Sequence, residues 1–262
     1  MTPQSGSYDL GRVSTADEAQ RLGSQAASIW SREQAALRAA GLTPGLTILD
    51  IGCGAGGMLG QLHVHFQPKL AVGVDLNREF LISARSVAAV SRSDDARLPF
   101  NDNVFDFVLM RLVLRHAPSR RELINEAKRV VRPGGIVCAI DVDEGATVFD
   151  PEPRTWPALK NALVVSAQRR GGDPFVGRIL RRLLLEAGLA SPVSAMLPVT
   201  SADLPASAFV DVMLAPSARA IDPDLLTPRQ TELAWAELRQ WAARGDGFGY
   251  VLGILAAARK SP

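Results

Sequence analysis

The stretch of sequence that best indicates the fold is residues 46–57, Leu46-Thr47-Ile48-Leu49-Asp50-Ile51-Gly52-Cys53-Gly54-Ala55-Gly56-Gly57. The apolar run 46–51 has the length of a buried strand, and residues 58–66 continue as a helix. Glycine in the turn between them permits positive φ and a close approach of the backbone to a ligand. The stretch therefore predicts a parallel α/β sheet with a ligand at the carboxyl end of its first strand.

The same alternation of apolar runs and helical segments continues along the chain. It predicts a parallel sheet with helices on both faces. Ser119 and Glu122 have the spacing of a capping box at the start of one helix. The expected strands are 46–51, 70–74, 87–91, 105–110 and 136–140, and the expected helices between them are 58–66, 77–85 and 119–130.

The two ends of the chain carry further helical segments. An apolar face over residues 15–40 predicts a helix that Thr15 or Asp17 caps and Gly41 ends. Residues 201–244 are expected to be mostly helical and interrupted by prolines. The remaining expected elements are helices at 154–170 and 176–187 and strands at 193–197 and 250–258.

The glycine spacing alone leaves the nucleotide open. Gly52, Gly54 and Gly57 satisfy the dinucleotide pattern G-x-G-x-x-G, and Asp75 lies at a suitable distance for a ribose hydroxyl. Asp50 disfavours a dinucleotide, because its carboxylate would face an anionic pyrophosphate. The loop also lacks the lysine of a phosphate-binding P-loop. A ligand with an amino group, a sulfonium and no phosphate has the opposite preference.

Acidic residues follow the first three expected strands. Asp50 ends the first, Asp75 ends the second, and Asp94 and Asp95 follow the third. These strand ends form the ligand-binding edge of an open α/β sheet. Asp75 is suited to both ribose hydroxyls. An acid after the third strand is suited to the exocyclic amine of adenine, and counting back from Leu98-Pro99-Phe100 favours Asp94, although an acidic pair before proline is also typical of a turn.

Five motifs over residues 46–141 resemble, in order and spacing, those of class I S-adenosylmethionine-dependent methyltransferases. They are Ile48–Gly56, Gly73-Val74-Asp75, Ser93–Phe100, Phe105-Asp106-Phe107-Val108 and Val131-Arg132-Pro133-Gly134-Gly135. The resemblance implies a Rossmann-like seven-stranded α/β sheet in the order 3-2-1-4-5-7-6, with strand 7 antiparallel. It also implies S-adenosyl-L-methionine as the cofactor.

The same resemblance implies a set of cofactor-binding residues. Asp75, beside Leu76, would hold the ribose, and Asp94 with the backbone of Asp95 would bind adenine. Cys53 would contribute only its backbone and small size. Asp50, Gly52 and Gly54 would surround the methionine part, and Met110 and Arg111 would lie beside its end. The other cofactor-binding residues of the loop would be Cys53 and Gly56.

The N-terminal segment is similar to that of ubiquinone/menaquinone-type methyltransferases, in Tyr8-Asp9-Leu10-Gly11, Arg21-Leu22 and Gln25-Ala26. This similarity implies that Gln25 contacts the cofactor and Tyr8 the methyl acceptor. The implied organisation is an N-terminal arm and helical lid over 1–44, a cofactor-binding core over 45–200, a helical substrate-lid insertion over 201–248, and the last strand and tail over 249–262.

Candidates for acceptor binding and catalysis follow the fourth and fifth strands. His116 is the candidate general base, with a hydrogen-bonded structural histidine as the alternative. Asp141, Asp143 and Glu144 would bind an amine or act as a base, with a solvated acidic loop as the alternative. Aromatic side chains that would wall an acceptor site, or else pack in the core, are Trp156, Trp235, Trp241 and Phe248.

Composition excludes several classes of protein. The 262 residues are 47% hydrophobic and 21% charged, with a net charge of +2, which disfavours a disordered chain and a nucleic-acid-binding surface. Two cysteines are too few for a disulfide framework or a four-thiolate zinc site. His63 and His65 face different directions on a helix, so no metal is expected. No run of about 18 apolar residues and no signal pattern is visible, which predicts a cytoplasmic protein without a membrane segment.

These observations predict an enzyme that transfers a methyl group by in-line displacement to O, N or C of a small-molecule acceptor, such as a secondary metabolite. The main alternative binds the same cofactor but catalyses a cyclisation or rearrangement. A nicotinamide oxidoreductase is disfavoured by Asp50. A nucleic-acid methyltransferase is disfavoured by the charge and by Met110-Arg111-Leu112-Val113, which stands in place of an Asn-Pro-Pro-Tyr or Asp-Pro-Pro-Tyr motif. A homodimer is a further expectation.

Overall fold

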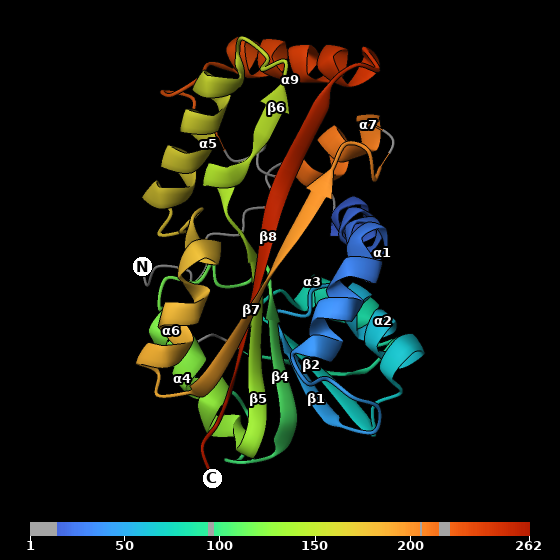
Figure 1. Cartoon of the computed structure of the whole chain (residues 1–262), viewed down its shortest axis with the longest axis vertical. Coiled ribbons are helices and arrows are strands. Elements are labelled where there is room, and N and C mark those ends of the chain that lie inside the picture. Colours follow the sequence, from blue (N-terminus) through green and yellow to red (C-terminus); the bar gives the residue numbers. More distant parts are fainter. Residues whose placement is uncertain (1–14, 94–96, 205, 215–220) are drawn as a thin grey trace.

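The computed structural model describes residues 15–93, 97–204, 206–214 and 221–262. They form a twisted sheet with helices on both faces (Figure 1). The strands are β1 (Thr47–Ile51), β2 (Leu70–Asp75), β3 (Ala89–Arg92), β4 (Phe105–Arg111), β5 (Val131–Val142), β6 (Val148–Asp150), β7 (Ala190–Thr200) and β8 (Phe248–Arg259). The helices are α1 (Thr15–Ala39), α2 (Gly57–Phe66), α3 (Arg78–Ala84), α4 (Arg120–Val130), α5 (Trp156–Arg169), α6 (Leu180–Glu186), α7 (Ala206–Ala208) and α9 (Pro228–Ala243), with short turns η1 (Glu144–Ala146), η2 (Val176–Ile179) and η3 (Phe209–Leu214).

The sheet has the expected strand order. Strands β3, β2, β1, β4 and β5 are parallel neighbours, and β8 is antiparallel between β5 and β7. The predicted order 3-2-1-4-5-7-6 is thus confirmed, with β7 as the sixth strand and β8 as the seventh. One strand was not predicted: β6 pairs with the start of β8, so that the described residues form eight strands.

Successive side chains of the central strands point to opposite faces of the sheet, and both faces are buried. On β4, Val108 and Met110 enter one apolar core, and Phe107 and Leu109 enter the other. Helices α1, α2 and α3 cover one face, and α4 and α6 cover the opposite face (Figure 1). Such two-sided burial is typical of a parallel sheet with apolar strands.

A third apolar cluster lies beyond the carboxyl ends of the parallel strands. It joins β6, α5, η3 and α9, at the top of Figure 1. Phe149 is central to it, with ring centroids 4.8 Å from Trp156 and 4.9 Å from Trp241. Strand β8 extends from the sheet into this cluster, where its first residues pair with β6.

The helix ends differ in part from the expectation. Gly41 adopts a φ of +101° just after α1, as predicted for a helix stop. The prediction of a capping box at Ser119 and Glu122 is wrong. The side chain of Ser119 makes no capping hydrogen bond, and its φ of −108° and ψ of 60° lie outside the extended geometry of a cap. A capping box that was not predicted forms instead between Thr227 and Gln230 at the start of α9.

Candidate functional site

Four ionisable side chains lie at the carboxyl edge of the sheet. Asp50 is near the end of β1, Asp75 ends β2, Arg111 ends β4, and Asp141 is near the end of β5. Strand β1 lies between β2 and β4, so Asp50 has Asp75 and Arg111 on its neighbouring strands. The topology thus brings together three residues that the sequence separates by up to 61 positions.

The glycine loop after β1 requires glycine at its first position. The N–H groups of Gly52 and Cys53 donate to the carbonyl of Val74, at 2.8 and 3.0 Å. Gly52 has a φ of +72°, and a Cβ there would lie 2.3 Å from Cγ2 of Val113. Gly54 and Gly56 also have positive φ. The loop therefore turns tightly against the segment that follows β4.

Asp75 organises this loop. Its Oδ2 accepts the N–H of Gly54 at 2.8 Å, and its Oδ1 accepts the N–H of Asn77 at 2.8 Å. Burial raises the pKa of Asp75, while these backbone hydrogen bonds oppose the rise. A carboxylate has about four acceptor sites, so Asp75 can accept a further hydrogen bond. Leu76 beside it is 37% exposed, so this end of β2 is open to a ligand.

A buried ion pair joins α1 to β4 beside Asp50. The Nε of Arg111 donates to both carboxylate oxygens of Glu33, at 2.8 and 3.0 Å. Burial raises the pKa of Glu33, and Arg111 opposes that rise. Burial also raises the pKa of Asp50 to about 7; Arg111 lowers it, and Asp75 and Glu33 raise it further.

Two buried polar atoms at this place have no hydrogen-bond partner among the described residues: Nη2 of Arg111 and Oδ2 of Asp50. The side chain of Arg111 is only 9% exposed, and Asp50 is 1% exposed. Buried polar groups in folded proteins are normally paired. An unmet cationic donor and an unmet acceptor on adjacent strands are complementary to a ligand that carries both a carboxylate and an ammonium group.

Two other expected cofactor neighbours are buried in the apolar core. Met110 is 1% exposed and packs in the core on the side of α4. Cys53 is 6% exposed, and its Sγ lies 2.6 Å from where a Cβ on Gly73 would stand, so Gly73 makes room for it. Burial raises the pKa of the Cys53 thiol. The side chain of Cys53 is therefore buried, and only its backbone lines the loop.

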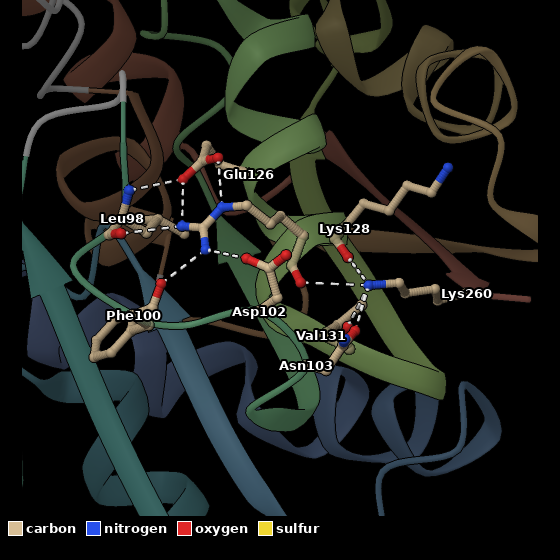
Figure 2. Close-up of polar contacts among 9 residues, drawn as sticks. Leu98, Phe100, Asp102, Asn103, Glu126, Lys128, Val131 and Lys260 are labelled. Carbon is tan, nitrogen blue, oxygen red and sulfur yellow. Dashed lines mark hydrogen bonds and ion pairs between the residues drawn. The ribbon is translucent and has the colours of Figure 1, made fainter. Parts of the chain in front are cut away.

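Two side chains of α4 bind the backbone of the loop that follows β3. Arg129 donates to the carbonyls of Leu98 and Phe100, at 3.1 and 2.7 Å, and pairs with Glu126 and Asp102 (Figure 2). Glu126 in turn accepts the N–H of Leu98 at 2.9 Å. The proposed adenine-binding residues just upstream, Asp94 and Asp95, lie outside the described residues, as does Tyr8; Gln25 lies in α1, but its side chain is outside the description.

His116 lies in the turn after β4. Its backbone N–H donates to the carbonyl of Val113 at 2.9 Å. Burial lowers the pKa of His116 to about 3, and Arg115, Arg170 and Arg120 lower it further, so the imidazole is neutral at pH 7. A neutral histidine offers one donor and one acceptor but is a weak base here.

The acidic residues after β5 have protein partners. Asp141 accepts the N–H of Arg115 at 3.0 Å, and burial raises its pKa to about 6. Asp143 forms a bidentate ion pair with Arg178, at 2.5 and 2.7 Å. Glu144 pairs with the guanidinium of Arg115 at 2.8 Å. These contacts make a structured acidic loop rather than the solvated loop that was the alternative.

Of the four aromatic residues that were candidates for the wall of an acceptor site, three are buried and one is exposed. Trp156, Trp235 and Trp241 are all buried in the third apolar cluster, as the core-packing alternative predicted. Phe248 is 48% exposed. Trp156 is therefore separated from solvent, and the structure brings it together with Phe149 rather than with Asp50 and Arg111.

Residues 49–139 match a family described as methyltransferase domain. This match confirms the resemblance of the five motifs to methyltransferases over these residues. Within the part of the chain that the structure describes, no helix is long and apolar enough to cross a membrane, and no three acidic, histidine or cysteine side chains are grouped to hold a metal.

Relatives of this methyltransferase domain cover parts of the chain. The ubiquinone/menaquinone biosynthesis C-methyltransferase UbiE of Cupriavidus taiwanensis is 32% identical over 51% of this chain and 58% of its own length. Three other curated relatives match over only 27–47% of their lengths. Phosphoethanolamine N-methyltransferase 2 of Haemonchus contortus, solved with S-adenosyl-L-methionine, has a TM-score of 0.57 at 18% identity, over 88% of this chain and 53% of that one. The cyclase SpnF has a TM-score of 0.53 at 20% identity, over 100% of this chain and 89% of that one.

Sequence reasoning missed Glu33 of α1. Glu33 is 2% exposed and belongs to the buried stripe of α1 that includes Ala26, Trp30 and Leu37. An acidic residue in an apolar stripe at helical spacing was the available signal, because such a residue requires a buried partner. Its partner Arg111 follows 78 positions later, too far for a local pattern to reveal.

Proposed function

We propose that the chain is an enzyme that binds S-adenosyl-L-methionine and transfers its methyl group to a small-molecule acceptor. The observation that carries the proposal is the pair of buried, unpartnered atoms, Oδ2 of Asp50 and Nη2 of Arg111. The α-amino-acid end of the cofactor has one ammonium and one carboxylate group, which would satisfy both atoms. The family match and the cofactor-bound neighbour of the same fold support the proposal.

The chain's residues then have separate tasks. Asp50 and Arg111 would hold the amino-acid end, Asp75 the ribose, and Asp94 and Asp95 the adenine. When bound, the cofactor supplies a methyl group that its sulfonium already activates. The protein would therefore contribute mainly by holding the acceptor in line and excluding water, which is worth about 7–11 kcal/mol of barrier.

Residues after β4 and β5 would receive the acceptor. His116, neutral at pH 7, would act as a hydrogen-bonding group there rather than as a cation. Asp141, whose pKa burial raises to about 6, is the stronger base of the two. Tyr8 and Asp143 would be further groups on the acceptor side, whereas Trp156, which is buried in the apolar cluster, would support that side only by packing.

Calorimetric titration tests the cofactor site. We expect Asp50→Asn and Arg111→Gln each to weaken binding of S-adenosylhomocysteine by about tenfold or more, because each removes a charge-assisted hydrogen bond. Methylthioadenosine, which lacks the amino-acid end, is the matched control and should bind all three proteins equally. Equal losses for both ligands, or tight binding of a nicotinamide dinucleotide instead, would contradict the proposal.

A cyclase that uses the same cofactor without methylation is the second candidate. It is supported by the fold alone, since the similarity to SpnF extends over 100% of this chain at 20% identity. Release of S-adenosylhomocysteine in step with product formation favours the methyltransferase. Turnover of an acceptor without that release favours the cyclase.

A further inference from the structure

Strand β7 forms one edge of the sheet (Figure 1). It pairs with β8 on one side, and no strand among the described residues pairs with its other side. Its 11 residues include no charged side chain. Val193 is 47% exposed on one face of the strand, and Met196 is 74% exposed on the other. The open side of β7 is therefore accessible from both faces of the sheet.

The pairing with β8 shows which backbone groups of β7 point to this open side. Just after the strand, the N–H of Ser201 donates to the carbonyl of Gly249 at 2.8 Å. Residues of an antiparallel strand alternate between those that bond to the neighbouring strand and those whose backbone groups point away from it. The residues of β7 that point away from β8 are therefore Ser194, Met196, Pro198 and Thr200.

The chain itself satisfies the outer backbone groups at both ends of β7. Near the start of the strand, Nη1 of Arg181 donates to the carbonyl of Pro192 at 2.6 Å. At the other end, the N–H of Thr200 donates to Oδ2 of Asp203 at 2.8 Å. Only the middle of the strand is left without such contacts.

The middle of β7 keeps unpaired backbone groups. In the part of the chain that the structure describes, nothing bonds to the outward N–H and carbonyl groups of Ser194 and Met196. Pro198 has no N–H to satisfy. An uncharged edge strand with free N–H and carbonyl groups is a template for pairing with a further strand. The template here is short and is centred on Ala195.

This open stretch is complementary to itself. If β7 of a second copy lies antiparallel to it and is centred on the same residue, Ser194 of each copy faces Met196 of the other. Each of these two pairs can exchange both of its backbone hydrogen bonds. Pro192 and Pro198 lie three residues before and after Ala195, so they fall at the two ends of the paired stretch, where neither leaves an N–H unsatisfied.

The side chains also suit a pair of identical strands. On the face that α1 covers, Val193 of one copy would lie opposite Leu197 of the other, and on the other face Met196 would lie beside Ser194. No like charges oppose each other within the strand. The antiparallel orientation brings the end that carries Arg181 towards the end that carries Asp203 of the other copy, whereas a parallel orientation would bring like charges together.

We propose that the chain forms a dimer in which β7 pairs antiparallel with β7 of a second copy, about a two-fold axis at Ala195. The two sheets then form one continuous sheet. Such a two-fold interface is closed, so the association ends at two copies. The interface involves neither Asp50 nor Arg111, and the inference is therefore independent of the proposed methyl transfer.

Two measurements on the full chain test the proposal. Sedimentation velocity over a range of concentrations should show a monomer converting to a dimer and to nothing larger. Hydrogen exchange at low and high concentration should locate the contact. We expect exchange of peptides covering residues 190–200 to slow as the dimer forms. Peptides covering β3, at the opposite edge of the sheet, are the internal control and should not change.

A proline variant tests the backbone pairing itself. Met196→Pro removes an outward N–H without removing a hydrogen bond to β8, so it should be tolerated at this edge. It should weaken dimerisation about tenfold or more, because each copy loses one hydrogen bond across the interface. Met196→Leu keeps the N–H and an apolar side chain, and should dimerise like the wild type.

A charged variant provides a second test if the proline variant is unstable. Met196→Asp places a carboxylate of each copy near the two-fold axis and should also weaken the dimer. Val64→Asp is its matched control, because Val64 is 70% exposed on α2, away from β7. An unfolding temperature close to that of the wild type shows that a variant is folded.

Several outcomes overturn the inference. They are a monomer at every concentration, assemblies that continue to grow beyond two copies, or a dimer that folded Met196→Pro and Met196→Asp leave unchanged. A monomer whose residues 190–200 become protected only when a synthetic uncharged peptide of unrelated sequence is added would assign the edge to another protein. That result would also overturn the proposed dimer.

Discussion

At the scale of one residue, the buried carboxyl group of Asp50 serves the proposed binding site at the expense of the free energy of unfolding. Its carboxyl group is 1% exposed, and burial raises its pKa to about 7. The folded chain therefore holds a proton that the unfolded chain releases near its ordinary pKa. Between about pH 4 and about pH 7 the free energy of unfolding falls as pH rises, because the folded state binds more protons in that window. A ligand ammonium beside Oδ2 would compensate the buried charge.

The first prediction concerns the pH dependence of cofactor binding. Since the ammonium group of S-adenosylhomocysteine requires the ionised Asp50, its affinity should rise by up to about tenfold per pH unit below pH 7 and level off above it. Calorimetry in buffers of different ionisation enthalpy should show one proton released on binding at low pH. Asp50→Asn, which leaves Asp75 and Glu33 to titrate, should flatten the profile. A wild-type affinity that does not change with pH would refute this assignment.

A second prediction concerns Gly52. Gly52→Ala would place a Cβ 2.3 Å from Val113 at a φ of +72°. Gly134→Ala is the matched control, because Gly134 has a φ of +76° and nothing within 4 Å of its Cβ position. The φ penalty of about 1–2 kcal/mol is common to both. We therefore expect both variants to unfold at lower temperature, Gly52→Ala the more so, and only Gly52→Ala to lose affinity for S-adenosylhomocysteine.

At the scale of elements, α4 stabilises two distant segments through its last turn. Arg129 and Glu126 hold the backbone of Leu98 from both sides, and Lys260 donates to the carbonyls of Lys128, Arg129 and Val131 at the end of the helix (Figure 2). Cationic side chains at a helix C-terminus satisfy carbonyls that have no partner within the helix. Burial lowers the pKa of Lys260, which remains a donor to these groups.

A third prediction separates these two anchors. Arg129→Gln should weaken S-adenosylhomocysteine binding severalfold, because the loop that continues from the proposed adenine-binding residues loses its carbonyl contacts at Leu98 and Phe100, each worth about 1.5–3 kcal/mol with a charged donor. Hydrogen exchange of peptides covering residues 97–102 should accelerate. Lys260→Gln should reduce the unfolding temperature without either effect. Identical behaviour of the two variants would show that Arg129 acts on stability alone.

The elements that were predictable are those with a strong local pattern. The strands around Asp50 and Asp75 are short apolar runs between helices, so their order followed from the alternation and the family motifs. Strand β6 was not predictable, because it has three residues and depends on pairing with β8, about 100 positions later. The same limit applies to Glu33, whose burial makes sense only beside Arg111. Ser119 had cap spacing, yet its backbone geometry prevents the cap.

At the scale of the whole molecule, two ion pairs join α1 to other parts of the chain, one to the end of β4 and one to the turn after β7. Glu33 pairs with Arg111 in the interior, where the two side chains are 2% and 9% exposed. The preceding residue, Arg32, pairs with Asp203 at 2.6 Å, where the side chains are 37% and 23% exposed. Adjacent residues of one helix thus form one buried and one solvent-accessible ion pair. Of these two pairs, the buried one belongs to the proposed cofactor site.

The fourth prediction uses this comparison. Glu33→Gln leaves the guanidinium of Arg111 buried without its counter-charge, and breaking such a pair costs about 3–5 kcal/mol. Arg32→Gln should cost less than about 1 kcal/mol, since the Arg32–Asp203 pair is partly exposed to water. Chemical unfolding measures the free energy of unfolding of both variants, and its repetition with S-adenosylhomocysteine measures how much the ligand stabilises each of them. Because Arg111 then lacks the group that orients Nη2, the ligand should stabilise Glu33→Gln less than it stabilises Arg32→Gln. If the ligand stabilises both variants equally, the attachment of α1 and the binding of the amino-acid end are independent, and Glu33 only supports the fold.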